Sequence, residues 1–186
     1  MKLHVGCGDI YLKGYVNIDV VGDLAAKVTE KELKENETTL NSYFKYPFGS
    51  PRRKIIVDKR INLLKKWPFK DDSVSKIVMI SCIEHFEKKD ALFVIGEVKR
   101  ILKRGGVFLV DFPDLEKQYK KYYKKDPEFF MELVYCNHKN KYSIHHWGYT
   151  TETFKKMIGS NFLCIKKQVV KHAYPMTGIK AVKLYG

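Results

Sequence analysis

Two short stretches near the amino end carry residues whose types and spacing could hold a nucleoside. The segment 2–5 runs into Gly6-Cys7-Gly8, a pattern typical of a buried strand that ends where the backbone approaches a ligand, because glycine has no Cβ. A second predicted strand, 15–20, carries Asp19 near its end. A carboxylate at that point can accept hydrogen bonds from both hydroxyls of a ribose. Together the two stretches predict a nucleoside pocket.

The spacing of these residues argues against a dinucleotide as the ligand. Tyr11 stands where the third glycine of Gly-x-Gly-x-x-Gly would be needed, and Asp19 comes sooner than the roughly 20 residues typical of dinucleotide folds. The connection 6–14 is also shorter than the dozen or so residues that a helical crossover needs, which predicts a loop with a single helical turn.

More polar residues follow the later strands. The stretch 54–58 predicts a third strand that ends in Asp58, and 76–81 predicts a fourth that runs into Ser81-Cys82-Ile83-Glu84-His85. Ligands of open α/β sheets bind at the carboxyl ends of the strands. His85 and the pair His145-His146 are candidates for a catalytic base or for acceptor binding, because imidazole titrates near neutral pH. For each histidine the alternative is a structural role.

The remaining pattern predicts the fold. Residues 90–102 have apolar positions at helical spacing, 104–106 are expected to end that helix, and 107–112 predict a fifth strand. Further helices are predicted at 116–125, at 127–136 and from position 150 or 151 to 159, and 162–170 with 180–185 predict a final antiparallel hairpin. The sequence thus predicts an α/β fold with a doubly wound, mostly parallel, seven-stranded sheet and helices on both faces.

Length and composition indicate one domain. A chain of 186 residues with 45% hydrophobic residues can bury a full core, so we expect a single domain over residues 1–186. The segment 22–53 is charged and then aromatic, and it is expected either to cover the pocket or to pack on the outer face of the fold.

Targeting and cysteine patterns add two expectations. With no apolar run near the roughly 20 residues of a membrane span and a strand at the very start, a cytoplasmic protein is expected. The cysteines at 7, 82, 136 and 164 have neither metal-ligand nor redox spacing, so no metal and no disulfide is predicted.

The formal charge of +14 is the unusual property of the composition. Such a charge is typical of proteins with a polyanionic partner, such as nucleic acid or an anionic membrane surface, but a general compositional bias is the favoured explanation. The lysines and tyrosines of 116–125 could hold a phosphate backbone and stack on bases. A solvated lysine face with the tyrosines packed inward is the favoured reading.

Several of these pieces, in this order and spacing, resemble one family. The stretches Leu3-His-Val-Gly-Cys-Gly-Asp9 and Tyr15-Val-Asn-Ile-Asp19 are similar to the first motif and the ribose acid of class I S-adenosylmethionine-dependent methyltransferases. Trp67-Pro-Phe-Lys-Asp-Asp-Ser73 through Glu84-His85, and residues 97–107, resemble further motifs of the small branch related to ubiquinone and menaquinone methyltransferases. The resemblance covers residues 1–112, with a weaker likeness at 146–150.

The resemblance implies S-adenosylmethionine as cofactor and S-adenosylhomocysteine as product. Residues 6–8 would wrap the methionine part, Asp19 would hold the ribose, Asp58 with Lys59 would lie beside the adenine, and Ser81-Cys82 would close the sulfonium side. His4 stands where relatives carry a carboxylate toward the cofactor's ammonium group. We count it among the expected cofactor-binding residues, with an effect on affinity rather than on reaction type.

Three functions follow as alternatives. The favoured one is methyl transfer to oxygen or nitrogen of a small metabolite or a sugar or glycan precursor. The second is methylation of RNA or another nucleic acid, which the basic charge supports and the absence of an Asn/Asp-Pro-Pro-Tyr motif weakens. The third is a cofactor-binding interaction protein without catalysis. The oligomeric state is left open.

Overall fold

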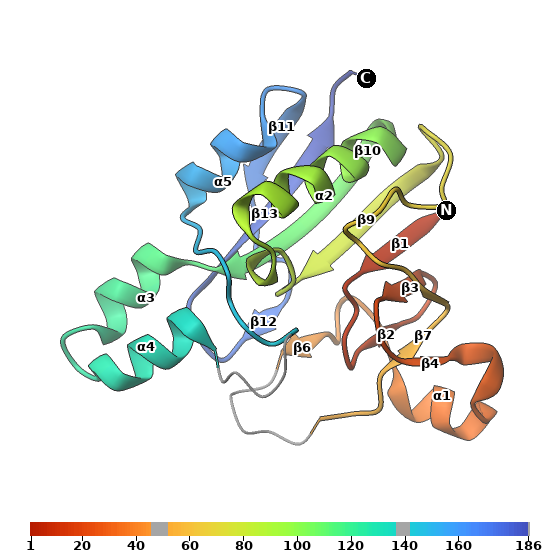
Figure 1. Cartoon of the computed structure of the whole chain (residues 1–186), viewed down its shortest axis with the longest axis horizontal. Helices are drawn as coiled ribbons and strands as arrows, with labels where there is room; N and C mark the ends of the chain where they lie inside the picture. Colours follow the sequence, from red (N-terminus) through yellow and green to blue (C-terminus); the bar gives the residue numbers. More distant parts are fainter. Residues whose placement is uncertain (46–51, 137–141, 186) are drawn as a thin grey trace.

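The computed structural model describes residues 1–45, 52–136 and 142–185, and its centre is a twisted seven-stranded sheet (Figure 1). The strands stand in the order β11-β13-β10-β9-β1-β3-β8. They span Lys2–Val5 (β1), Val16–Asp19 (β3), Lys59–Arg60 (β8), Val74–Ile80 (β9), Leu102–Pro113 (β10), Phe162–Lys166 (β11) and Met176–Lys183 (β13). Neighbours from β8 to β10 are parallel, and β13 runs antiparallel to both β10 and β11. The predicted doubly wound sheet and its antiparallel end are confirmed.

The helices begin and end largely where the sequence predicts. They span Glu30–Asn36 (α1), Lys88–Ile101 (α2), Leu115–Tyr122 (α3), Pro127–Tyr135 (α4) and Thr151–Ile158 (α5), with short 3-10 turns at Ala25–Lys27 (η1) and Ile83–His85 (η2). The hydroxyl of Thr150 accepts the first-turn amide of Thr153, and Gly159 ends α5 at a φ of +80°. Among the described residues, no helix is long and apolar enough to cross a membrane.

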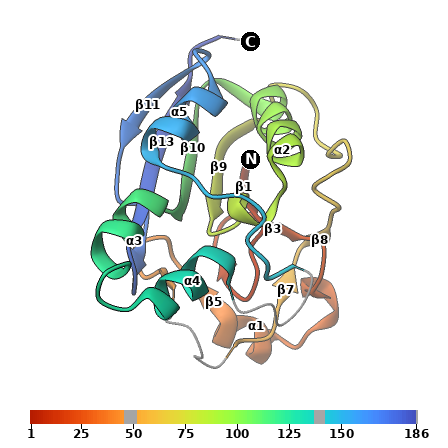
Figure 2. The same ribbon diagram turned by 60° about the vertical axis from the view of Figure 1, so that its left-hand side comes forward.

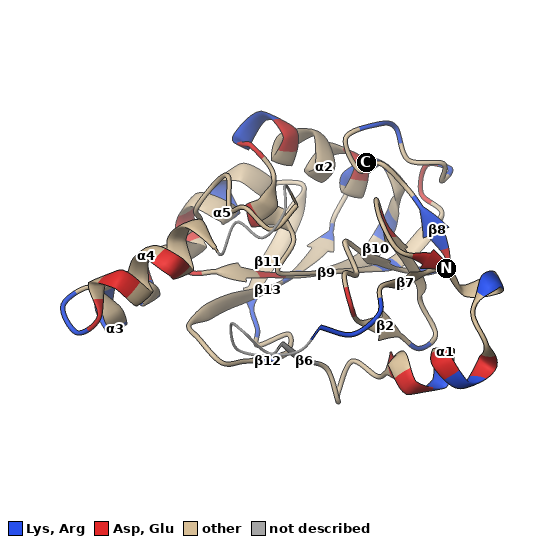
Figure 3. Ribbon diagram, turned by 60° about the horizontal axis from the view of Figure 1, so that its bottom comes forward, with Lys and Arg blue, Asp and Glu red and all other residues tan. Residues whose placement is uncertain are grey.

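One face of the sheet is covered by α2 and α5 (Figure 3). The apolar positions of α2 recur at helical spacing, so Val94, Val98 and Ile101 are completely buried on the side that meets the sheet. Phe154 of α5 packs with Phe112 of β10, their ring centroids 4.6 Å apart. This layer contains most of the hydrophobic core.

The opposite face is covered by loops, α1 and short strand pairs, as Figure 3 shows. These pairs join Tyr11–Leu12 (β2) to Glu37–Thr38 (β5), Asp23–Leu24 (β4) to Ile56–Val57 (β7), and Phe44–Lys45 (β6) to Lys171–His172 (β12). A second core cluster lies beneath them, formed by the sheet residues Val78, Ile80 and Leu109 and by residues of the covering segments: Ile10, Leu12, Tyr43 and Val170.

Three local predictions are wrong. The connection 6–14 contains the short strand β2 instead of a helical turn. The strand predicted at 54–58 is divided into β7, which pairs with β4 outside the main sheet, and β8, which begins just past position 58 and joins the main sheet beside β3. Gly105 and Gly106 do not end α2, which stops at Ile101. They lie inside β10, where its register against β9 shifts between Leu102 and Val107.

The helices α3 and α4 pack side by side and extend beyond the sheet, as Figures 1 and 2 show. Lys124 and Lys125 follow the end of α3, so the predicted continuous lysine face is shorter than expected. The tyrosines are not packed inward as predicted. Tyr119 is 50% exposed and Tyr123 is 42% exposed, and their rings stack with centroids 4.6 Å apart.

Candidate functional site

A cavity of about 730 Å³ opens where neighbouring parallel strands end at the same edge of the sheet. Gly6 follows β1, Asp19 ends β3, Ser81 follows β9 and Pro113 ends β10, and all four line the cavity. The chain leaves β1 toward β3 on one side, and β9 lies on the other side of β1, so this edge is the topological switch point of the sheet. Ligands of doubly wound folds bind at such a point.

In the cavity floor, the backbone at Gly6 lies very close to the side chain of Cys82. Gly6 has a φ of +62°, and a Cβ added to it would lie 2.1 Å from Sγ of Cys82 on the neighbouring strand end. The amide of Gly6 donates to the carbonyl of Ile18 at 2.9 Å, which holds the turn against β3. No larger side chain fits at this position, so the backbone forms the surface that a ligand would meet.

The carboxylate of Asp19 is fixed by main-chain donors. The amide of Gly8 donates to Oδ2 at 2.9 Å, and the amide of Val20 donates to Oδ1 at 2.7 Å. The amide of Val21 is a longer, third donor, at 3.4 Å from Oδ1, so the acceptor position that remains for a ligand hydroxyl lies on Oδ2. The glycine turn and the acid thus form one unit through this contact.

Ser81 is held in an unusual backbone conformation beside the cavity. Its φ of +47° is uncommon for a residue other than glycine. The Asp111 carboxylate lies behind it, accepting the Ser81 amide at Oδ1 at 3.1 Å and meeting Nε2 of His172 at Oδ2 at 2.8 Å. Asp111 is 1% exposed, so this buried pair fixes the strand end from below the cavity.

The candidate histidines come together at one wall of the cavity. His85, His145 and His146 all line it, and the rings of His85 and His145 lie with centroids 5.0 Å apart. Nδ1 of His85 is 2.9 Å from the carbonyl oxygen of Ile144, and Nδ1 of His145 is 3.0 Å from that of Leu133. A carbonyl oxygen only accepts, so each Nδ1 carries a proton and Nε2 is the other ring nitrogen.

Main-chain contacts join the two segments that supply these histidines. The amides of His146 and Trp147 donate to the carbonyl oxygen of Glu84, at 2.9 and 3.2 Å. The segment before α5 is thereby fixed to η2, although the two are far apart in the sequence. Glu84 itself lines the cavity and is 2% exposed.

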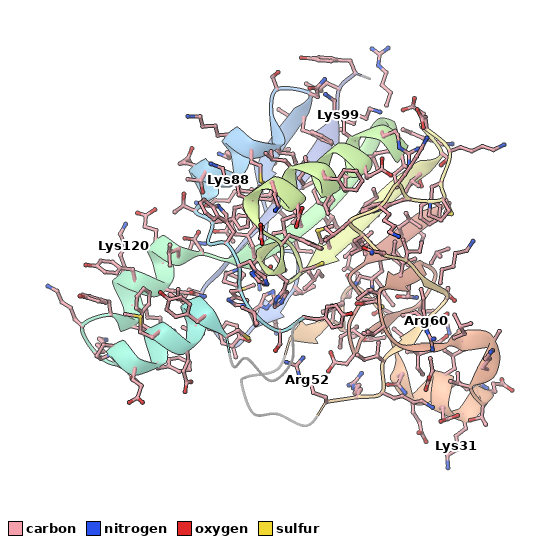
Figure 4. All side chains as sticks on the ribbon, viewed as in Figure 1. Lys31, Arg52, Arg60, Lys88, Lys99 and Lys120 are labelled. Atoms are coloured by element: carbon pink, nitrogen blue, oxygen red, sulfur yellow. The ribbon has the colours of Figure 1, made fainter. Side chains whose placement is uncertain are left out.

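Charged residues from the predicted insert lie at the cavity. Arg52 and Arg53 both line it, and Arg52 Nη1 is 3.8 Å from Oδ2 of Asp9. Figure 4 shows the Arg52 side chain extending toward the centre of the molecule from the segment before β7. The part of the insert at 46–51, which holds two of its four aromatic residues, lies outside the described residues.

Four of the predicted cofactor residues do not line the cavity. His4 is completely buried, with Nδ1 3.0 Å from Oδ1 of Asn17. Cys7 is also buried, with its thiol directed toward backbone carbonyl oxygens. The Asp58 carboxylate accepts the Asn17 amide at 2.7 Å and the Tyr11 hydroxyl at 2.7 Å, and Lys59 is exposed on β8. The division of strand 54–58 explains why Asp58 lies away from the carboxyl edge.

Several residues of the site are missed by sequence reasoning. They include Asp9, Arg52, Arg53, Asn62, Cys136, Ser143 and Tyr174, which all line the cavity. The two arginines had a signal, because they end a segment for which covering the pocket was one of two expectations. Tyr174 had none, since it comes from the loop between β12 and β13. Burial raises the pKa of Tyr174 to about 12, so its hydroxyl stays protonated at neutral pH.

These residues fit an adenosyl sulfonium compound. The cavity volume of about 730 Å³ lies in the range of about 300–1,000 Å³ that is usual for sites of such ligands. A Cβ on Gly6 would collide with Cys82, which keeps the backbone bare at this point, and Asp19 presents its acceptors at the end of the neighbouring strand. The sequence motif and the switch point therefore coincide in space.

Comparisons with known proteins agree with this arrangement. Residues 3–110 match the family model described as Methyltransferase domain. A Mycolicibacterium smegmatis protein described as a probable S-adenosylmethionine-dependent methyltransferase is 32% identical over 112 residues, which are 60% of this chain and 37% of that protein. The match thus spans little more than a third of that relative.

Solved structures show the same fold. A SAM-dependent methyltransferase from Methanosarcina mazei has a TM-score of 0.58 at 18% identity, covering 100% of this chain and 92% of that one. A Pyrococcus horikoshii protein has a TM-score of 0.57 at 15% identity, covering 99% and 81%. With the family match over more than half of its length, this chain belongs to the methyltransferase domain family.

Proposed function

We propose that this protein transfers a methyl group from S-adenosylmethionine to an oxygen or nitrogen of a small metabolite or a sugar or glycan precursor. The observation that carries the proposal is the contact between Gly8 and Asp19 beneath the cavity, at 2.9 Å. It joins a glycine turn to an acid at the carboxyl ends of adjacent strands, where a nucleoside can bind through both backbone and carboxylate.

The residues divide into a donor side and an acceptor side. Gly6 and Gly8 would receive the methionine part, Asp19 the ribose hydroxyls, and Ser81 with Cys82 the sulfonium side. When bound, S-adenosylmethionine supplies an electrophilic methyl carbon. His4 and Cys7, which are buried and do not line the cavity, would support its walls from behind, whereas Asp58 and the exposed Lys59 lie outside its lining.

On the acceptor side, the histidine wall and the two arginines would orient the substrate. The acceptor's hydroxyl or amine would donate to Nε2 of His85 or His145, or to His146, and give up its proton there. Its lone pair then forms the new bond to the methyl carbon, and the electron pair of the broken carbon–sulfur bond stays on sulfur. Holding the two partners in line supplies several kcal/mol of barrier reduction. Arg52 and Arg53 favour an acceptor that carries an acidic group.

Calorimetric titration with S-adenosylhomocysteine tests the donor side. The parent protein is expected to bind, and Asp19→Ala to lose affinity about 100-fold, because hydrogen bonding to a charged acceptor is lost. Asp23→Ala is the matched control, since Asp23 is an exposed carboxylate just past β3 that pairs with Lys54 and Arg60. Equal affinity of Asp19→Ala and Asp23→Ala would show that the pocket is assigned to the wrong residues.

A second candidate, methylation of nucleic acid, is favoured by the pair α3–α4. The half-exposed, stacked rings of Tyr119 and Tyr123 lie beside exposed lysines at 120, 121, 124 and 125, and Figure 3 shows Lys and Arg in the loop at the tip of this pair with Asp and Glu along the helices. Aromatic rings next to cations can stack on bases and hold phosphates.

Salt dependence separates the two candidates. Binding of a single-stranded oligonucleotide through several phosphate contacts should weaken steeply between about 50 and 200 mM salt. The substitution Tyr119→Ala should weaken it further, whereas Tyr185→Ala, which removes an exposed tyrosine at the other end of the sheet, should not. Binding that is absent at low salt would leave the small acceptor as the proposed substrate.

A further inference from the structure

The cavity wall contains three side chains of the types that bind transition metals. Glu84 and His85 lie on η2, directly after β9, and His145 lies on the segment before α5. One ligand atom from each residue can be chosen so that all three lie within 4.8 Å of one another. Over residues 1–45, 52–136 and 142–185 this is the one such group of three.

The two histidines are oriented as metal ligands usually are. Nδ1 of His85 and Nδ1 of His145 each donate to a backbone carbonyl oxygen, at 2.9 and 3.0 Å. Metal-bound histidines almost always donate their other ring N–H to a carbonyl or carboxylate, which fixes the tautomer and the ring orientation. The Nε2 atoms are therefore the coordinating atoms.

The group is also held together independently of any ion. The Glu84 carbonyl accepts the amides of His146 and Trp147, so the segment that carries His145 stays beside η2. The Glu84 side chain is 2% exposed, so a carboxylate oxygen that bound an ion there would be shielded from bulk water.

We propose that Glu84, His85 and His145 bind a divalent transition-metal cation, with Zn²⁺ or Fe²⁺ as the class that fits two imidazoles and one carboxylate. Ligand atoms that share a tetrahedral ion at about 2.1 Å lie about 3.4 Å apart. Side-chain rotation that closes the spread of 4.8 Å by about 1.4 Å would complete the site. The remaining coordination positions face the cavity.

The chemical role of this ion rests on the proposed methyl transfer, whereas its binding does not. An acceptor hydroxyl at an open position would have its pKa lowered, and its proton would leave to water. The acceptor oxygen would then be held beside the donor side of the cavity. With the ion bound, His85 and His145 would be ligands, and of the three candidate proton acceptors of the proposed reaction His146 would be the one outside the metal site.

The test uses the full chain, freed of metal with a chelator and titrated with Co²⁺ and with Zn²⁺. The parent protein should bind about one equivalent, with a visible Co²⁺ spectrum of low-symmetry coordination that Zn²⁺ displaces. His145→Ala and Glu84→Gln should each weaken binding about 100-fold or more. His146→Ala is the matched control, because it removes the neighbouring imidazole and keeps the three ligands.

Two measurements keep the outcomes distinct. X-ray absorption on the Zn²⁺-loaded parent should show two imidazoles in the coordination shell. This measurement uses the parent alone, so it does not depend on whether a variant folds. Absence of stoichiometric binding in the parent, or a His145→Ala variant that binds like His146→Ala, would overturn the site. S-adenosylhomocysteine titrated into the metal-free protein reports on the proposed function separately, since the donor side of the cavity contains none of the three ligands.

Discussion

Gly6 and Cys82 meet at the floor of the cavity so closely that a Cβ on Gly6 would lie 2.1 Å from the Cys82 Sγ. The two residues follow β1 and β9, the neighbouring parallel strands at the switch point of the sheet. The contact leaves room for a ligand on the open side of the Gly6 backbone and for nothing larger than hydrogen on the other. Two strand ends far apart in the sequence thus define one surface.

Gly6→Ala should therefore lose S-adenosylhomocysteine binding by about tenfold or more and lower the free energy of unfolding by about 1–3 kcal/mol. Both the positive φ of +62° and the contact with Cys82 contribute. Calorimetry and urea unfolding measure the two effects. Gly96→Ala is the control, since a Cβ there meets nothing within 4 Å and alanine is the better helix former. A Gly6→Ala variant that binds as tightly as Gly96→Ala would contradict the close approach.

The histidine wall predicts a separation of turnover from cofactor affinity. Substituting His85, His145 and His146 one at a time by asparagine should reduce turnover by about 100-fold for at least one of them, with S-adenosylhomocysteine affinity unchanged. The reason is that these side chains lie on the acceptor side, away from Gly8 and Asp19. Product formation in an acceptor screen and calorimetry provide the two readouts. Parent-like turnover in all three variants would reject a role for these histidines.

Asp111 contacts both the buried His172 and the cavity residue Ser81, so we expect its substitution to lower the free energy of unfolding. Asp111→Ala leaves the Ser81 amide and the His172 ring without this acceptor, which should cost about 2–4 kcal/mol in the free energy of unfolding. Asp111→Asn keeps an oxygen for the Ser81 amide and an amide group for Nε2, so its loss should be smaller. Urea unfolding measures both. Equal stability of the parent and the alanine variant would show that the pair does not hold Ser81.

A pH dependence is expected from Glu97 on α2. Hydrogen bonds from Arg100 lower the pKa of the Glu97 carboxyl, and the backbone amide of Trp67 lowers it further by donating at 2.6 Å. A carboxyl whose pKa is lower in the folded state stabilises the protein fully above its unfolded pKa of about 4.3, and this contribution is lost as the pH falls toward the folded pKa. The free energy of unfolding should thus decline below about pH 5.

Glu97→Gln removes this contribution and should destabilise the protein by about 2 kcal/mol at pH 7. Its free energy of unfolding should also decline less steeply than that of the parent between about pH 5 and pH 3. Urea unfolding at several pH values measures the slopes. Glu87→Gln, at an exposed position before α2, serves as the control. If the free energy of unfolding fell equally steeply with pH in the parent and in Glu97→Gln, the lowered pKa of Glu97 would be contradicted.

Much of the fold was predictable because its signals are local. The strand that ends in Gly6 and Gly8, the acid at 19 and the helix α5 between Thr150 and Gly159 all follow from neighbouring residue types. The glycines at 105 and 106 were misread as a helix end, because a shift of strand register depends on the partner strand. The division of 54–58 likewise depends on which segment pairs with β4 and which with β3.

The site was predictable only in part, for a related reason. Asp19, Ser81 and Cys82 were found because each ends or follows a strand, and strand ends meet at one edge of a parallel sheet. Asp58 fits the same pattern in the sequence, yet its carboxylate binds Tyr11 and Asn17. The meeting of Glu84 with His145 depends on a long-range backbone contact, which no local pattern indicates.

A crystal structure of the protein grown with S-adenosylhomocysteine tests the central claim most directly. The account predicts the ribose hydroxyls within hydrogen-bond distance of Asp19, the amino-acid part beside the Gly6–Gly8 turn and the sulfur near Ser81 and Cys82. A compound bound elsewhere, or a cavity at this edge that stays closed to it, would contradict the account.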